Sequence, residues 1–239
     1  MKYLDLTLPT PEANLACDEA LLDLCESGSG TEILRIWEPA TAFVVLGYAN
    51  RIATEVNMAF CQQNQIPILR RCTGGGTVLQ GPGCLNYSLI LRIEEAGPLS
   101  TVTSTNRQVM NKQQGLFSAL LNREVQVRGD TDLALGDRKF SGNAQRRRRH
   151  FLLFHGSILL DCDLALIERA LPLPSKEPRY RERRAHVGFL TNLNISAPQV
   201  KRAFQEAWNA RDTLRDVPWN SIEQLAKDKY SLDAWTRLS

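Results

Sequence analysis

The sequence has no apolar run that reaches the ~18 residues required for a membrane-spanning helix. Its N-terminal apolar stretch is interrupted by acidic residues, which the core of a secretory signal does not contain. These two absences predict a cytoplasmic protein that has no membrane partner.

The six cysteines are dispersed and include no Cys-x-x-Cys pair. Such spacing indicates neither a disulfide framework nor a zinc site. Most of the thiols are therefore predicted to be small buried groups. Cys72 and Cys84 lie in the glycine-rich motif region, and the sequence leaves open whether they have a functional role. The chain also lacks a strong excess of charge, since 29 Lys+Arg and 26 Asp+Glu give a net charge of +3. A dedicated nucleic-acid-binding domain is usually more basic, so no nucleic-acid partner is expected.

No internal repeat and no linker rich in Pro, Gly or Ser divides the 239 residues. A single domain over residues 1–239, with its core at about 30–217, is expected. Periodicity and caps predict helices that begin at Thr10-Pro11, Thr54, 103, 163, Ser196 and Asn220. The predicted strands are 33–37, 42–48, 66–71, 86–93, 124–128, 131–135 and 151–160. The last strand is nearly continuous in apolar character and is predicted to be central. Neighbouring strands with scattered helices predict an α+β fold, in which helices pack on a mixed, largely antiparallel sheet.

The segment RRCTGGGTVLQGPGCLNYSLIL, residues 70–91, holds three consecutive glycines after a strand. Bare backbone of this kind can turn its N–H groups toward a ligand, although two tight turns between strands would use the same residues. It is neither a Walker A loop nor a Gly-x-Gly-x-x-Gly fingerprint. Arg70 and Arg71 end the strand and must point to opposite faces. One of them can face a pocket, and the sequence leaves open which one.

The segment GDRKFSGNAQRRRRHFLLFHGSILLD, residues 136–161, is the second motif. A hairpin turn at Gly136-Asp137 puts Lys139 at the start of the next segment, and the small polar residues 141–144 suit close approach by a ligand. Lys139 is either a functional cation or a surface lysine, and His155 is either a site residue or a satisfied core histidine. The four arginines at 146–149 lack interleaved aromatic residues, which favours a polar hairpin tip over a nucleic-acid surface.

Together, several segments resemble the lipoate–protein ligase A family, which shares one catalytic-domain superfamily with the biotin ligases and octanoyltransferases. The segments are NLACDEALL (14–22), LRIWEPATAFVVLGYAN (34–50), RRCTGGGTVLQGPGCLNYSLI (70–90), GDRKFSGNAQRRRR (136–149) and HGSILLD (155–161), with weaker matches at 190–193 and 228–235. Each is weak alone, but they occur in the family's order and cover nearly the whole chain. The resemblance implies a catalytic domain of the biotin/lipoate ligase fold.

The resemblance also implies an activity in two steps. The carboxylate of lipoate attacks the α-phosphorus of ATP to give lipoyl-AMP and pyrophosphate, and a lysine of a lipoyl-carrier domain then takes the lipoyl group. Lys139 matches the family's catalytic lysine and would stabilise the negative charge that builds in both steps. Mg²⁺ would neutralise the ATP phosphates, and no protein ligand to a metal is implied. The implied substrate-binding residues are Arg70, Gly74, Gly75, Gly76, Asn86, Asp132, Gly142, Asn143, Ala144 and His155.

The chain departs from the family at three places. Gln80 stands where the family usually has histidine, which leaves the role of this position open. The sequence shows no trace of the C-terminal accessory domain of the long ligases, so a separate accessory protein or a change to transferase chemistry is expected. Gly81-Pro82-Gly83 resembles the related octanoyltransferases, which take acyl groups from a carrier protein without ATP.

These departures leave three interpretations: an ATP-dependent ligase, a carrier-dependent acyltransferase, and a binding module without enzymatic activity. Cysteine-dependent transferases of this superfamily place a nucleophile shortly before the lysine loop, whereas residues 122–138 contain no cysteine. This favours an ATP-dependent ligase over a carrier-dependent acyltransferase. The Gly-Arg-Gly-Arg-x-Gly loop of the biotin ligases is missing from the sequence, which disfavours a biotin ligase. A binding module is the third hypothesis, as an RNA binder or as an inactive adaptor. In the ligase interpretation the arginines at 146–149 would grip an acidic lipoyl-carrier domain or form a solvated hairpin.

Overall fold

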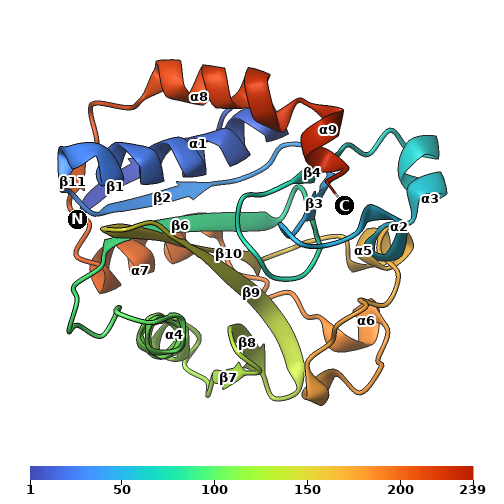
Figure 1. Ribbon diagram of the computed structural model, residues 1–239. Helices are drawn as coiled ribbons and strands as arrows, with labels where there is room; N and C mark the ends of the chain where they lie inside the picture. The colour runs from blue at the N-terminus through green and yellow to red at the C-terminus, as the bar shows by residue number, and fades with distance from the viewer. Residues whose placement is uncertain (239) are drawn as a thin grey trace.

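The computed structural model describes residues 1–238, which form two β-sheets with helices packed around them (Figure 1). The strands of the large sheet, in spatial order, are β11 (Asp212–Thr213), β1 (Lys2–Asp5), β2 (Ile33–Trp37), β6 (Cys84–Arg92), β10 (Phe151–Leu159), β9 (Arg138–Arg147), β8 (Asp132–Leu135) and β7 (Gln126–Arg128). Strands β2, β6, β10, β9, β8 and β7 pair antiparallel in turn, while β1 pairs parallel with both β2 and β11. The predicted α+β fold with a mixed, largely antiparallel sheet is confirmed.

The small sheet carries the glycine-rich motif. Its strands, in spatial order, are β4 (Ile68–Arg70), β3 (Phe43–Leu46) and β5 (Val78–Gln80). The three glycines lie in the connection between β4 and β5, which are the two outer strands of this sheet. Because β3 lies between β4 and β5, the connection must cross from one edge of the small sheet to the other.

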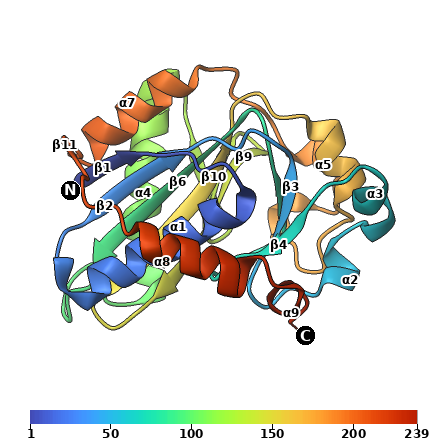
Figure 2. The same cartoon turned by 90° about the horizontal axis from the view of Figure 1, so that it is seen from above.

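The helices cover both faces of the large sheet. Helices α1 and α8 lie on one side, and α4 and α7 lie on the other (Figures 1 and 2). Their bounds are α1 (Pro11–Leu24), α2 (Ile52–Glu55), α3 (Met58–Gln63), α4 (Val102–Leu121), α5 (Leu164–Ala170), α6 (His186–Phe189), α7 (Ala197–Ala207), α8 (Trp219–Leu225) and α9 (Asp233–Thr236), with further helical turns at Cys25–Ser29, Arg179–Arg181 and Ala226–Tyr230. Within residues 1–238, no helix is both long enough and apolar enough to cross a membrane.

Two caps read from the sequence are present, because their side chains satisfy the first free N–H groups of a helix. Thr10 accepts a hydrogen bond from the backbone N–H of Ala13 at the start of α1, and Ser196 forms a capping box with Gln199 at the start of α7. Strand β10 is central as predicted, since it pairs with β6 on one side and β9 on the other.

Other boundaries differ from the predictions. The helix expected at Thr54 is two short helices, of which α2 begins at Ile52 and α3 is capped by the Asn57 side chain. Helix α8 begins at Trp219, before the capping box expected at Asn220. Strand β1 was not predicted, nor was the strand character of residues 138–147. Strand β1 gains its backbone partners from strands distant in the sequence, whereas β9 pairs with the strands directly before and after it.

The hydrophobic core also extends beyond the expected 30–217. Leu21 of α1 is packed with Trp37 of β2, and Ile222 of α8 and Tyr230 complete the same cluster. On the opposite face of the sheet, a second cluster surrounds Phe204 of α7. The sheet therefore needs the N-terminal helix and the residues after 217 to bury the apolar side chains on its α1 face.

Candidate active site

A cavity of about 860 Å³ lies between the two sheets and brings most of the predicted site residues together. Its lining includes residues of strands β2, β3 and β5 to β10, of helix α1, of the glycine-rich connection between β4 and β5, and of the segment 174–181. Nine predicted residues line it: Gly75, Gly76, Asn86, Asp132, Lys139, Gly142, Asn143, Ala144 and His155. Two predicted residues, Arg70 and Gly74, are absent from its lining.

Lys139 is held in this cavity by an ion pair. Its ammonium lies 2.7 Å from Oδ1 of Asp132, on the neighbouring strand β8, and the two side chains are 24% and 14% exposed. The Tyr180 hydroxyl donates to Oδ2 of Asp132 at 2.8 Å. Burial, followed by the charge of Asp132, raises the pKa of Tyr180, so its hydroxyl keeps its proton. The carboxylate is thus fixed from both sides and orients the lysine.

Glycine at position 142 is required by the path of the Lys139 side chain. A Cβ atom on Gly142 would lie 2.6 Å from Nζ and 2.8 Å from Cε of Lys139. Lys139 therefore folds back across β9 and lies against the Gly142 backbone. The small residues of this motif are what allow the ammonium to sit beside the strand rather than extend into solvent.

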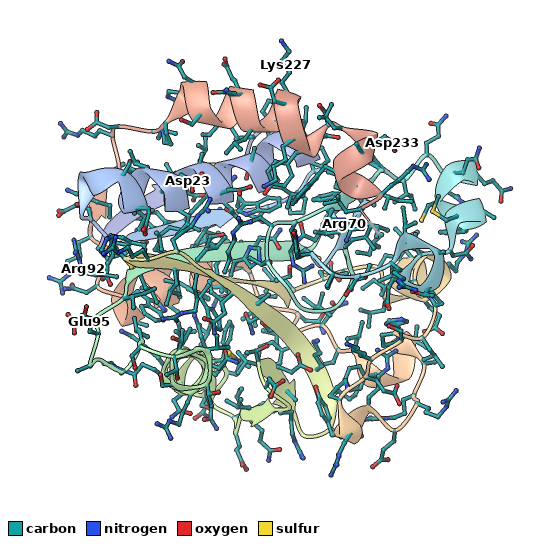
Figure 3. All side chains as sticks on the ribbon, viewed as in Figure 1. Asp23, Arg70, Arg92, Glu95, Lys227 and Asp233 are labelled. Carbon is teal, nitrogen blue, oxygen red and sulfur yellow. The ribbon has the colours of Figure 1, made fainter. Side chains whose placement is uncertain are left out.

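Arg70 is a correction to the predicted site. Its side chain is 1% exposed and is absent from the cavity lining, and Arg70 is labelled just below the C-terminal helix α9 in Figure 3. Its guanidinium donates to the backbone carbonyls of Gly47, Tyr48, Asn50, Trp235, Thr236 and Leu238. Because these carbonyls occupy its donors, Arg70 fastens the C-terminal segment to the small sheet and does not reach the site.

Arg71 faces the cavity instead, on the opposite side of the chain as strand alternation requires. Its guanidinium donates to the carbonyls of Gly74 and Gly76, the latter at 2.8 Å, and its Nε donates to the Thr73 hydroxyl at 2.9 Å. Burial lowers the pKa of Arg71 to about 10, so the side chain remains a cation at neutral pH. Strand alternation left open which of the two arginines faces the pocket, and the family resemblance implied Arg70, whereas the residue that lines the cavity is Arg71.

The glycine connection carries donors that no intramolecular acceptor uses. Among residues 1–238, the N–H groups of Gly74, Gly75 and Gly76 make no hydrogen bond, while Arg71 holds two of their carbonyls. Gly75 has φ +85°, and a Cβ atom there would lie 2.9 Å from Nη2 of Arg71 and 3.3 Å from Cβ of Ala144. Three adjacent free N–H groups beside a cavity can bind the oxygen atoms of a phosphate or carboxylate.

Asn143 is a structural element of the wall. Its Oδ1 accepts a hydrogen bond from the Tyr87 hydroxyl at 2.6 Å, and its Nδ2 donates to the Thr131 carbonyl at 2.7 Å. The Thr131 hydroxyl returns a bond to the Asn143 carbonyl at 2.7 Å. A Cβ atom at Gly156 would collide with Asn143 Oδ1. Asn143 thus locks the turn between β7 and β8 against β9 and leaves little of its own amide for a ligand.

Part of the wall consists of buried polar atoms with no partner. Ser157 accepts from Nε2 of Gln80 at 3.1 Å and donates to Oδ1 of Asn86 at 2.6 Å. Within residues 1–238, the remaining atoms Oε1 of Gln80, Nδ2 of Asn86 and Nε1 of Trp37 are buried and unpaired. A ligand or water molecules in the cavity can supply the missing partners. Trp37 and Gln80 were not among the predicted binding residues. They lie close to Asn86 only in the folded chain, and the sequence alone does not show this proximity.

His155 lines the cavity through a chain of side-chain contacts. Its Nε2 lies 2.7 Å from the Thr73 hydroxyl, and its Nδ1 lies 3.2 Å from Oδ2 of Asp18 in α1. Asp18 is paired in turn with Arg35 at 2.6 Å. Burial alone would raise the pKa of Asp18, but Arg35 and then His155 outweigh burial and lower it. The imidazole is therefore fixed at both nitrogens rather than being a solvated base.

The arginine run is largely committed to contacts within the chain. Arg146 donates to the Cys72 carbonyl at 3.2 Å and lies 3.4 Å from the buried Glu19 carboxylate. Arg147 donates to the carbonyls of Leu99 and Ser100. The next two arginines belong to the turn between β9 and β10, where Arg148 pairs with Asp23 at 2.8 Å. The hairpin predicted at 146–149 is present, but only Arg148 and Arg149 lie in its turn, because Arg146 and Arg147 belong to β9.

Charged residues line the cavity from β7, from β8, from the turn between these strands and from the segment 174–181. The cations are Arg128, Lys176, Arg179 and Arg181, and the carboxylates are Asp130, Asp132 and Glu177. Within residues 1–238, no three His, Cys, Asp or Glu side chains are grouped so as to hold a metal ion. The arrangement suits an anion, or a cation that brings most of its own ligands.

No cysteine lines the cavity in the described part of the chain, where all six thiols are buried. Burial raises the pKa of Cys72 to about 11, which disfavours the thiolate. Sγ of Cys84 lies 2.9 Å from Sγ of Cys162, away from the cavity lining. The site therefore offers no thiol nucleophile in this arrangement.

Comparisons with known proteins agree with this geometry. The profile of the family described as "Lipoyl protein ligase A/B catalytic domain" matches residues 10–209. Octanoyltransferase LipM of Halalkalibacterium halodurans is 28% identical over 271 residues, a match that covers 98% of this chain and 97% of that protein. Lipoate-protein ligase A subunit 1 of Thermoplasma acidophilum is 28% identical over 249 residues and covers 96% and 94% respectively.

A solved structure of a lipoate-protein ligase A bound with ATP superposes with a TM-score of 0.81 at 25% identity, covering 99% of this chain and 98% of that one. This likeness confirms the fold expected from the motifs. The relatives carry two activities in their names, ligase and octanoyltransferase, so sequence similarity leaves the choice between them open.

Proposed function

The chain belongs to the lipoyl protein ligase A/B catalytic-domain family, and we propose that within it the protein is an ATP-dependent lipoate–protein ligase. One observation carries the proposal: the Lys139 ammonium and the free N–H groups of the glycine connection border the same cavity, which contains no thiol among the described residues. Such a site can stabilise an acyl-adenylate but supplies no cysteine to carry an acyl group.

The first step forms a bond between a carboxylate oxygen of lipoate and the α-phosphorus of ATP, and it breaks the bond from that phosphorus to the leaving pyrophosphate. Negative charge builds on the oxygens around the α-phosphorus. Lys139 supplies a fixed positive charge there, oriented by Asp132 before substrate arrives. Groups oriented in advance stabilise a transition state without reorganising during the reaction.

The second step transfers the lipoyl group to a lysine amine of a carrier domain. The amine nitrogen attacks the carbonyl carbon, the bond from that carbon to the phosphate oxygen breaks, and AMP leaves while the amine loses a proton. Lys139 again faces the developing charge, now on the carbonyl and phosphate oxygens. The N–H groups of Gly75 and Gly76 can donate to the same oxygens.

The cavity fits the charge of ATP. Arg128, Lys176 and Arg179 line it as cations that can contact phosphates. A magnesium ion would have the carboxylate of Asp130 available, because Lys139 and Tyr180 engage both oxygens of Asp132. In such sites Mg²⁺ is held by one or two carboxylates together with substrate phosphates. When bound, the ion would neutralise phosphate charge.

The acceptor in this proposal is a lipoyl-carrier domain. A separate accessory protein is part of the proposal because the Thermoplasma relative is named as one subunit of a ligase. The arginine run is a weak candidate for contact with an acidic carrier, because Arg146 and Arg147 are bound within the chain. Arg148 and Arg149 remain the exposed members of the run.

A carrier-dependent octanoyltransferase is the second candidate. The octanoyltransferase from Halalkalibacterium halodurans matches 98% of this chain and 97% of its own length, and the acyl cavity would serve either activity. In that reaction the acyl group leaves a carrier thioester and ATP has no role. Without a cavity thiol, the amine of the acceptor would have to attack the thioester directly.

The deciding experiment measures the intact mass of an acceptor lipoyl domain by mass spectrometry. The acceptor is incubated with the protein and free lipoate, with or without ATP and magnesium, and in a parallel reaction with octanoyl-carrier protein and no ATP. We expect a lipoyl-sized gain that requires ATP. A gain only from octanoyl-carrier protein would replace the ligase proposal with the transferase, and no gain in any reaction would contradict both for the isolated chain.

A further inference from the structure

A continuous line of hydrogen bonds runs from the interior of the large sheet to the glycine connection. It starts at Arg35 of β2, whose side chain is 0% exposed and lies 2.6 Å from Oδ1 of Asp18. Oδ2 of Asp18 contacts Nδ1 of His155 at 3.2 Å, and Nε2 of His155 contacts the Thr73 hydroxyl at 2.7 Å. The same hydroxyl accepts from Nε of Arg71 at 2.9 Å.

Arg71 completes the line because it donates to the carbonyls of Gly74 and Gly76. Four separate parts of the chain thus meet: β2, helix α1, strand β10 and the connection between β4 and β5. The start of the line is also anchored, since Arg35 donates to the Leu6 carbonyl and to the Asn14 side chain. Arg35, at one end of the line, lies in the core. Arg71, at the other end, holds the glycine-rich loop that borders the cavity.

The chemistry of the groups fixes the two outer hydrogen bonds of the line, because Nε of Arg71 can only donate and the Asp18 carboxylate can only accept. The Thr73 hydroxyl accepts from Arg71, so its own proton is free to donate to Nε2 of His155. Nδ1 of His155 then carries the proton that is donated to the Asp18 carboxylate. Both ring nitrogens of His155 and the Thr73 hydroxyl thus have partners within the line. The Thr73 hydroxyl therefore connects His155 to Arg71.

We propose that Asp18, His155 and Thr73 form a positioning relay that holds residues 74–76 in the conformation that encloses the acyl substrate. The inference rests on the proposed function, because it assigns the cavity to an acyl group. Thr73 is a positioning residue: it is 1% exposed and does not line the cavity, so it acts on substrate only through the loop.

The expected effect follows from the population of the closed loop. Without the relay, the glycine-rich segment has fewer contacts to oppose its large conformational freedom. If the closed conformation falls to about one tenth of the population, the apparent affinity for substrate falls about tenfold. A tenfold change corresponds to about 1.4 kcal/mol, which is the scale of one or two lost hydrogen bonds. Saturating substrate restores the closed loop, so turnover is preserved.

Three variants separate positioning from general destabilisation. Thr73→Val keeps the shape of the side chain and removes the hydroxyl, while Thr73→Ser keeps the hydroxyl. Thr105→Val is the matched control, because Thr105 in α4 is 0% exposed and its hydroxyl donates to the Thr101 carbonyl at 2.7 Å and accepts from Arg147 at 3.0 Å. Thr105 is not part of the cavity wall.

The steady-state assay measures KM for lipoate and kcat for each variant. We expect Thr73→Val to raise KM about tenfold with kcat within twofold of the unsubstituted chain. Thr73→Ser should return KM to within about twofold, and Thr105→Val should lower the melting temperature without raising KM. An unchanged KM in Thr73→Val would overturn the relay. A fall in kcat at constant KM would also overturn it, because it would place Thr73 in the chemical step.

A second measurement needs no substrate. The backbone N–H of Tyr48 donates to the Thr73 carbonyl at 2.8 Å, so hydrogen exchange at Tyr48 reports on how firmly the loop is held at Thr73. Exchange should be faster in Thr73→Val than in Thr73→Ser and unchanged in Thr105→Val. If the unsubstituted chain proves not to be a ligase, equal exchange in all the variants would still refute the relay. Faster exchange in Thr73→Val alone would support it independently of the ligase proposal.

Discussion

Replacing Lys139 by alanine removes the ammonium that the proposed mechanism places beside the reacting phosphate. Loss of one preorganised group that stabilises developing charge typically slows an enzyme by about 10²–10³, or roughly 2.7–4 kcal/mol of transition-state stabilisation. The effect on folding should be smaller. The Lys139–Asp132 ion pair is partly exposed, at 24% and 14%, and pairs of this kind contribute up to about 1 kcal/mol.

The assay follows pyrophosphate release and lipoyl transfer in the same reaction, with melting temperature measured on each variant. Lys201→Ala is the matched control, because Lys201 also forms an ion pair, at 2.8 Å to Glu38, but lies outside the cavity. It should keep activity within about twofold. Lys139→Arg should not restore the rate, because the ammonium packs directly against Gly142 and leaves no room for a guanidinium.

One result would refute the assignment of Lys139. If Lys139→Ala released pyrophosphate at the rate of the unsubstituted chain with saturating substrates, the ammonium could not be the main stabilising charge. A loss of activity together with a fall in melting temperature far beyond that of Lys201→Ala would instead show that Lys139 is needed for the fold.

Three further outcomes are expected. Gly142→Ala should lower activity at least tenfold while the chain stays folded, because the new Cβ displaces the Lys139 ammonium; a full rate in this variant would contradict the packing argument. Asp18→Asn should cost about 3–5 kcal/mol in urea unfolding, because Arg35 is left as a buried unpaired charge. At Asp18 and Glu19, burial alone would raise the pKa, but neighbouring cations lower it. Both carboxyls therefore stabilise the fold above about pH 4–5, their unfolded range, and this stability is lost as pH falls through their folded pKa values. Urea unfolding at several pH values checks this, and stability that is unchanged down to pH 3 would contradict it.

Local patterns were sufficient for much of the fold. The predicted strands at 33–37 and 86–93 correspond to β2 and β6, and the predicted helix at 103–121 corresponds to α4. These elements are read from side-chain periodicity and caps, which depend on neighbours in the sequence. The same information failed at Thr54 and Asn220, where residues of capping type are present but the helix starts elsewhere.

Strand β9 is an element that local sequence patterns did not predict. Residues 138–147 contain lysine, serine, glycine and asparagine and end on three charged or polar residues in succession, which indicates a loop when considered alone. They form a strand because β10 and β8 pair with them on both sides. Their polar side chains are tolerated because part of this strand lines the cavity and Arg146 and Arg147 find partners on other elements.

The sequence by itself determined the family, the α+β architecture and most of the residues that meet in the cavity, because ordered motifs and periodicity are properties of the chain. Only the tertiary structure decided that Arg71 rather than Arg70 faces the site, and that His155 is tied to Asp18 and Thr73. The reason is physical. Strand alternation fixes that two adjacent side chains diverge, but which of them meets the C-terminal carbonyls and which meets the glycine carbonyls depends on elements that pack together only in the folded chain.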